Sequence, residues 1–244
     1  MSDSASPLDP GAAPARDVAA LLAARGLGGL ERAGRDAAGR AEWPALAVLP
    51  QMALARGRLH EATGAARRTL AALVAGAAQA EGPVLWLVPR WRAGGLCPQG
   101  LARFMPDPGA LITVGCPTAV DILWAMEEAL RAGCVALVVA EIAETPDLRQ
   151  VRRLHRAATE GCARAAQTGV GPLGLVCAQD HAESRVAGVE SRWALHPLPP
   201  VPEAMAQAPR WRLERQLARG LPPRDWVVDL PDRGRAVARD AALA

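Results

Sequence analysis

The chain has 244 residues, half of them hydrophobic, which is enough for one large domain with modest appendages. Its formal net charge is +3, and all 28 cationic side chains are arginines, because the sequence contains no lysine. This mild charge falls well short of the dense basic surface of an autonomous DNA-binding domain, so composition argues against that class.

The cysteine spacing and the first residues of the chain indicate the cellular compartment of the protein. No two cysteines have the C-x-x-C spacing of a zinc or redox site, so we expect reduced core thiols and no bound metal. The first residues, MSDSASPLDPGAAPA, have neither the basic nor the apolar region of a signal peptide, and no apolar run approaches membrane-spanning length. We therefore expect a cytoplasmic protein that makes no membrane contact.

Composition divides the chain into four segments. Residues 1–15, rich in Ser, Pro, Ala and Asp, are expected to form a disordered tail. Residues 16–45 are expected to form an N-terminal helical segment that is broken at a cluster of glycines. Residues 46–232 hold the core with its C-terminal edge strands, and residues 233–244 are expected to form a polar tail or a frayed helix.

The stretch GRLHEATGAARRTL, residues 57–70, has the order of elements found around a phosphate-binding loop. A short strand-like run enters a small turn at Gly64, and an alanine-rich helix follows. The loop backbone of such a site surrounds the phosphates, and a lysine reaches the outer ones. Here the corresponding residues are Gly64, Arg67, Arg68 and Thr69, and no lysine is available.

Apolar runs of strand length follow, and helix-like segments separate them. Such continuous runs are typical of strands buried on both faces of a parallel sheet. From about Val186 the pattern changes to strands between Pro- and Gly-containing turns, which are expected to form an antiparallel edge. The sequence therefore predicts an α/β fold with a mostly parallel sheet flanked by helices. The strands are expected at 83–89, 109–115, 134–142 and 171–178, and the helices at 67–82, 116–133 and 145–167.

In this order the elements resemble the core of the RecA recombinase. They resemble more closely the ImuA family of RecA-like accessory proteins for SOS-induced mutagenesis, above all in GRLHE and LWAMEEALR. The resemblance covers roughly residues 46–230. It implies a RecA-like core. The positions at which the sequence differs from the RecA pattern determine which activities of that core we expect here.

Three parts of the ATPase site depart from the RecA pattern. The loop after Gly64 is too short and lacks both the second glycine and the lysine. Pro89-Arg90 stands where recombinases carry the catalytic glutamate. Ala140 holds the metal-supporting aspartate position, and Glu141, one residue beyond, is expected to face the opposite side of the sheet. We therefore expect no enzyme activity, no catalytic residue and no cofactor.

Two arginine groups have alternative interpretations. Arg67 and Arg68 are either solvated charges in a first helical turn or residual contacts to an anion. A further set at helical spacing is either a basic stripe or an ordinary solvated face. Because the two loops that would bind single-stranded DNA are short and acidic, we expect only weak or indirect DNA contact. The helical set is Arg149, Arg152, Arg153 and Arg156.

Tryptophans and arginines mark two candidate partner surfaces. Trp124 lies on the charged side of its helix, so it is either covered by a neighbouring helix or a binding anchor. The C-terminal strands contain Trp211, Arg212, Arg215 and Trp226, which either pack within the sheet or present a docking edge. We expect the main partner contact at this edge, with Arg212 and Arg215 reaching solvent.

The ImuA resemblance implies a non-catalytic RecA-fold adaptor for error-prone translesion synthesis in the SOS response. The implied partners are an ImuB-like Y-family polymerase homologue and an error-prone replicative-type DNA polymerase, with RecA as a further contact. Two alternatives stay open. One is an inhibitor of filament growth or cell division in the SOS response, and the other is an ATP-dependent recombinase-like DNA-binding protein, which the shortened loop disfavours.

Overall fold

A computed structural model describes most of the chain from Trp43 onward. The described residues are 43–91, 95–165, 169–178, 185–199 and 209–229, together with the backbone of 237–240. The predicted tail and all but the last three residues of the predicted helical segment lie outside them. Residues 43–45 themselves form no helix.

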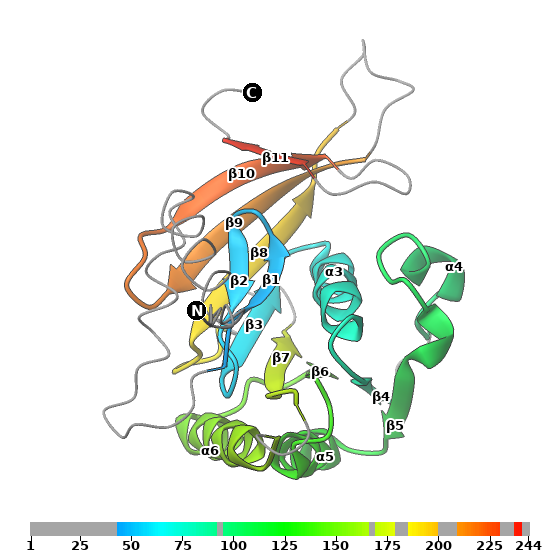
Figure 1. Ribbon diagram of the computed structural model, residues 1–244. Coiled ribbons are helices and arrows are strands. Elements are labelled where there is room, and N and C mark those ends of the chain that lie inside the picture. The colour runs from blue at the N-terminus through cyan, green and yellow to red at the C-terminus, as the bar shows by residue number, and fades with distance from the viewer. Residues whose placement is uncertain are drawn as a thin grey trace, which may run out of the picture.

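The core is one large mixed sheet. Its parallel strands are β3 (Leu59–Thr63), β4 (Val84–Pro89), β5 (Ile112–Cys116), β6 (Leu137–Glu141), β7 (Leu173–Cys177) and β8 (Ser191–Pro197), followed by the antiparallel β9 (Arg210–Ala218), β10 (Arg224–Asp229) and β11 (Val237–Asp240). The strand order is β11-β10-β9-β8-β3-β7-β6-β4-β5 (Figure 1). All pairs between β5 and β8 are parallel, and the pairs from β8 to β11 are antiparallel. The predicted fold class is confirmed.

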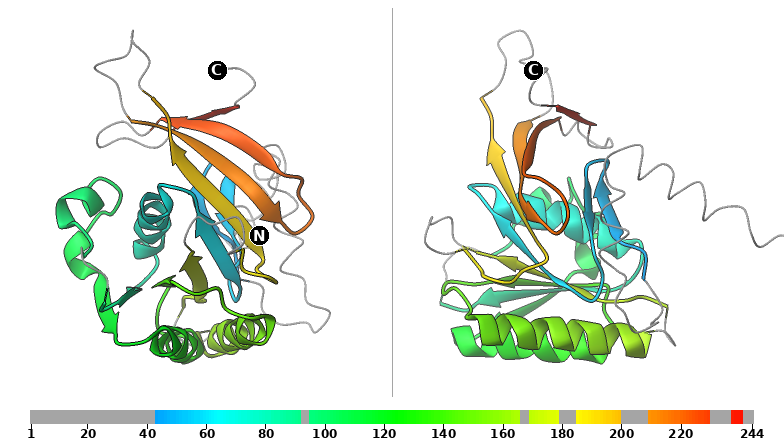
Figure 2. Two further views of the ribbon diagram at one scale, coloured as in Figure 1. Left: turned by 180° about the vertical axis from the view of Figure 1, so that it is seen from behind. Right: turned by 90° about the vertical axis from the view of Figure 1, so that its left-hand side faces the viewer.

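Helices cover both faces of the parallel strands, and each face has its own apolar core. Helix α3 (Arg67–Gln79) packs on one face, and α5 (Ala119–Ala132) and α6 (Leu148–Ala165) lie side by side on the other (Figure 2). Strands β6 and β7 are buried at every position, as their continuous apolar runs predict. No helix among the described residues combines the length and apolarity needed to cross a membrane.

Local sequence fixes the two ends of α5. Thr118 and Asp121 form a capping box, in which each side chain accepts a hydrogen bond from the other's backbone N–H. Gly133 ends the helix with φ 68°, the left-handed conformation that glycine adopts without strain. A Cβ on Gly161 of α6 would lie 1.9 Å from the carbonyl oxygen of Leu130, so glycine allows the two helices to touch.

Two further elements were not predicted from the sequence. A hairpin of β1 (Leu46–Leu49) and β2 (Met52–Leu54) forms a separate two-stranded sheet that packs against α3. Strand β11 lies where we expected a polar tail or frayed helix, so that expectation is wrong for residues 237–240. The short α4 (Pro98–Leu101) and the 3₁₀ turn η1 (Pro108–Ala110) precede β5.

The expectation that β8, β9 and β10 offer an exposed edge is also wrong. Each of them is hydrogen-bonded to a neighbouring strand on both sides, in the order β3-β8-β9-β10-β11. Their backbone N–H and C=O groups are therefore used within the sheet and cannot template an added strand.

Candidate functional site

The shortened loop between β3 and α3 is packed against β8 rather than open to a ligand. Gly64 has φ 87°, and a Cβ there would lie 2.5 Å from the carbonyl oxygen of Leu195. The Ala66 N–H donates to that same carbonyl at 2.9 Å, and the Arg67 N–H donates to the carbonyl of Gly64 at 3.1 Å. Two amides that would face a phosphate in a working loop therefore already have acceptors inside the protein.

A buried ion pair lies beside this loop. Glu141, at the end of β6, is 2% exposed. Its Oε2 accepts a hydrogen bond from Arg68 Nη2 at 2.7 Å, and its Oε1 accepts one from the Trp86 indole N–H at 3.2 Å. The carboxylate thus joins α3, β4 and β6 through both of its oxygens.

This pair corrects two expectations. Glu141 does not face away from the loop: β6 turns Ala140 toward the α5–α6 core, so Glu141 points toward α3. Arg68 is correspondingly an ion-pair partner rather than a free solvated charge. Arg67 and Thr69 are half-buried in the same helical turn, and a residual anion contact at Arg67 stays a prediction.

The arrangement is unsuited to a magnesium nucleotide. A metal ion at Glu141 would have to displace a guanidinium that already neutralises the carboxylate, and Arg68 would then face a cation. Among the described residues, no group of three or more His, Cys, Asp or Glu side chains could hold a metal. Cys177 lies in the same region, where burial, with the Glu141 charge second, raises the pKa of its thiol and keeps it neutral.

Polar side chains next to the loop form a closed network between β3 and β8. His60 Nδ1 lies 2.8 Å from Ser191 Oγ, and its Nε2 lies 2.9 Å from the carbonyl of Ala55. The Trp193 indole N–H donates to Ser191 Oγ at 3.0 Å. Burial lowers the pKa of His60 to about 4, so the ring is neutral at pH 7. Because His60 and Ser191 are both about 1% exposed, the pair serves the sheet rather than a substrate.

Glu61 and Arg192 form a second internal pair that sequence reasoning missed. Arg192 Nε donates to Glu61 Oε2 at 2.5 Å, and the Val186 N–H donates to Glu61 Oε1 at 3.2 Å. Burial raises the pKa of Glu61, and Arg192 acts in the opposite direction. The two residues are adjacent in register across β3 and β8, which could be found only once the strand pairing was known.

The C-terminal tryptophans pack inward. The rings of Trp193 and Trp226 are stacked with centroids 6.1 Å apart, and the guanidinium carbon of Arg215 lies 5.9 and 5.2 Å from them. Arg215 is 5% exposed and donates from Nε to the carbonyl of Pro222 at 3.0 Å. The expectation that Arg215 reaches solvent is therefore wrong, and Trp226, 4% exposed, is equally covered. The sheet-packing alternative describes this region.

Of the remaining partner candidates, Trp211 is half-buried, while Arg212 and Trp124 are exposed. Trp124 keeps 62% of its surface accessible, so the alternative in which a neighbouring helix covers it is wrong. A partner role for any of these residues stays a prediction. The most exposed tryptophan among the candidate partner residues is therefore Trp124 on α5, and not a residue of the C-terminal strands.

No protein-family model matches the chain. SulA from Pseudomonas aeruginosa matches at a TM-score of 0.38 with 19% identity, covering 49% of this chain and 97% of that chain, a likeness too low to carry an argument.

Protein ImuA from two Caulobacter vibrioides strains, NA1000 / CB15N and ATCC 19089 / CB 15, is 30% identical over 165 residues. The match covers 63% of this chain and 62% of the ImuA chains, so it spans less than two thirds of those relatives. This similarity confirms the resemblance to the ImuA family that was seen in the sequence.

Proposed function

We propose that the protein is a non-catalytic adaptor in SOS-induced mutagenesis, which acts by binding other proteins and not by turning over a nucleotide. The observation that carries this proposal is the Arg68–Glu141 pair, because it lies beside the loop between β3 and α3 and already neutralises the carboxylate that a metal ion would need. The packed loop at Gly64 and Ala66 supports the same conclusion. The similarity to ImuA supports the biological setting.

The proposed partners are an ImuB-like Y-family polymerase homologue and an error-prone replicative-type DNA polymerase, with RecA as a further contact. Direct DNA binding would be weak. The net charge of +3 supplies few phosphate contacts, and much of the exposed arginine on α6 is engaged, since Arg153 pairs with Glu127 and Arg156 with Glu160. The adaptor would then be brought to damaged DNA through its protein partners, in a cytoplasmic complex.

The test is a strain that lacks this protein and is complemented with defined variants. Wild type should restore ultraviolet-induced mutation frequency, and it should co-purify with the polymerase components when they are produced together. A variant with an intact surface and a disabled phosphate loop, Thr69→Ala, should complement fully. Loss of complementation by Thr69→Ala in a folded protein would contradict the proposal. Filamentous cells on overproduction, with unchanged mutation frequency, would instead identify a division inhibitor.

A further inference from the structure

A groove runs between the N-terminal halves of α5 and α6 on the face turned away from the sheet. It encloses a cavity of about 130 Å³. Two of the apolar residues at its rim are largely open to solvent: Val120 is 72% exposed and Trp124 is 62% exposed. Contiguous exposed apolar surface with a polar rim is typical of interaction sites. The walls are formed mainly by Val120, Leu123, Trp124, Gln150, Arg153 and Leu154.

The groove is held open by contacts on both helices. Glu127, 8% exposed, accepts hydrogen bonds from Arg131 on its own helix and pairs with Arg153 of α6 at 2.7 Å. The capping box at Thr118 fixes the first turn of α5, and the close approach at Gly161 fixes the helix spacing. Because these contacts lie within the protein, the site exists before any partner arrives, which lowers the entropic cost of binding.

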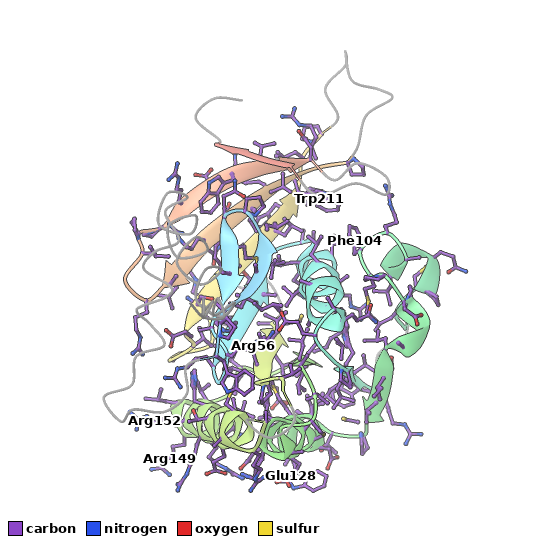
Figure 3. All side chains as sticks on the ribbon, in the orientation of Figure 1. Arg56, Phe104, Glu128, Arg149, Arg152 and Trp211 are labelled. Carbon is purple, nitrogen blue, oxygen red and sulfur yellow. The ribbon has the colours of Figure 1, made fainter. Side chains whose placement is uncertain are left out.

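Positive charge borders the groove on the α6 side. Arg153 lines the groove, and the exposed Arg149 lies one helical turn before it, next to the lining residue Gln150. Figure 3 shows Arg149 projecting from α6 away from the sheet. Within the part of the chain that the structure describes, no carboxylate forms an ion pair with Arg149. An apolar hollow beside an arginine row is complementary to an acidic, amphipathic chain.

We propose that this groove docks an acidic segment of a partner protein, which inserts one large apolar side chain beside Trp124 and pairs a carboxylate with Arg149. The cavity of about 130 Å³ is close in size to an engineered apolar cavity of roughly 150 Å³ that holds benzene. One leucine or phenylalanine side chain therefore fills it. The inference rests on the adaptor function for its biological setting and names the place and chemistry of one contact.

A nucleic acid fits this surface less well than a protein segment. The accessible lining of the hollow is mostly apolar and offers few hydrogen-bonding groups for a base edge. The exposed Glu144 lines the adjoining hollow, which shares Val120 and Leu123 with this one, and repels a chain that carries one charge per phosphate. A protein segment can place its acidic residues only where the arginines are.

The test begins with a library of random 16-residue peptides displayed on phage and selected in parallel on the wild-type protein and on Trp124→Ala. Peptides enriched on wild type and lost on Trp124→Ala should have a net negative charge and one large apolar residue. Selection that yields no Trp124-dependent peptide, or yields basic or uncharged ones, overturns the inference. Neither result bears on the adaptor function, which mutation frequency and polymerase co-purification test separately.

The strongest selected peptide is then labelled with fluorescein and titrated with variants in fluorescence anisotropy. Trp124→Ala should raise the dissociation constant of the peptide at least tenfold, and Arg149→Glu should raise it at least threefold. Arg152→Glu is the matched control: it makes the same charge reversal on α6 but lies two residues from Gln150 and Leu154, on the side away from the groove (Figure 3). Its effect should stay under twofold.

Three outcomes would overturn the docking surface. In the first, Arg152→Glu weakens binding as much as Arg149→Glu, which would indicate only general electrostatic attraction. In the second, an unlabelled single-stranded oligothymidine displaces the peptide at similar concentration, which would identify a nucleic-acid surface. In the third, sedimentation shows a wild-type dimer that Trp124→Ala dissociates, so that a second copy of the chain occupies the groove.

Discussion

Replacing Arg68 with alanine should destabilise the protein far more than the same change at Arg67, although the two arginines are adjacent and equally charged. Arg68→Ala removes the Arg68 guanidinium from the carboxylate of Glu141, which is 2% exposed. Arg67 sits in the same helical turn, but the structure shows no ion pair between it and a described carboxylate. The two substitutions therefore have the same helix propensity and differ mainly in the buried charge.

The expected loss follows from how the pair is buried. Removing one partner of a fully buried ion pair costs about 3–5 kcal/mol. The Arg68 side chain is 40% exposed and the Trp86 N–H still donates to Glu141 in the variant, so we expect a smaller loss. A free-energy loss of about 2 kcal/mol corresponds to a fall in Tm of roughly 4–8 °C for a domain of this size. For Arg67→Ala we expect a change within about 0.5 kcal/mol.

Equilibrium urea unfolding followed by far-ultraviolet circular dichroism measures both losses at constant pH. The combined variant Arg68→Met with Glu141→Gln removes the charge from both partners while the glutamine oxygen can still accept from Trp86. It should recover most of the stability that Arg68→Ala loses. Equal losses for Arg67→Ala and Arg68→Ala, or a combined variant no more stable than Arg68→Ala, would refute the reasoning.

Four other expectations can be measured with purified protein. Isothermal titration with ATP and magnesium should detect no binding, and a micromolar dissociation constant would contradict this. Single-stranded DNA should bind weakly and be released at physiological salt in anisotropy titrations. His60, whose pKa burial lowers to about 4, binds fewer protons in the folded than in the unfolded state between that pH and about 6.5. The free energy of unfolding should therefore fall by up to about 3 kcal/mol as the pH drops through this range. The variant His60→Gln has no imidazole to protonate and should not show this loss. Arg215→Ala should cost about 2 kcal/mol by removing its contacts with Trp193 and Trp226, whereas Arg212→Ala should cost almost nothing.

Elements with strong local patterns were predictable from the sequence. The apolar runs of β4, β6 and β7 identify parallel strands because continuous apolar runs of this length, bounded by turn residues, are typical of strands covered on both faces. Helix α5 could be delimited because Pro117 and Gly133 stand at its ends. The hairpin β1–β2 and strand β11 were missed, since strands of three or four residues carry too little periodicity to be recognised.

Side-chain direction was the part that sequence reasoning could not supply. The face to which Glu141 points depends on where β6 starts, and an error of one residue reverses it. Arg215 lies two residues after Leu213, so both side chains are on the inner face of β9. This period-two pattern was present in the sequence, but it was outweighed by the expectation that arginine is exposed to solvent. Its burial is possible because two indole rings take the place of water around the guanidinium.

The pair between Arg68 and Glu141 also determines how the buried acid at the end of β6 is neutralised. In a working site of this kind, a bound metal and a lysine would balance an acidic group at the end of this strand. Once both are gone, a buried carboxylate costs several kcal/mol unless another cation approaches or the acid is replaced. Here the cation comes from Arg68, the second residue of α3, the helix that follows the short loop at Gly64. Positions 68 and 141 should therefore tolerate change only together, and a double-mutant cycle between them should show a coupling of at least about 1 kcal/mol.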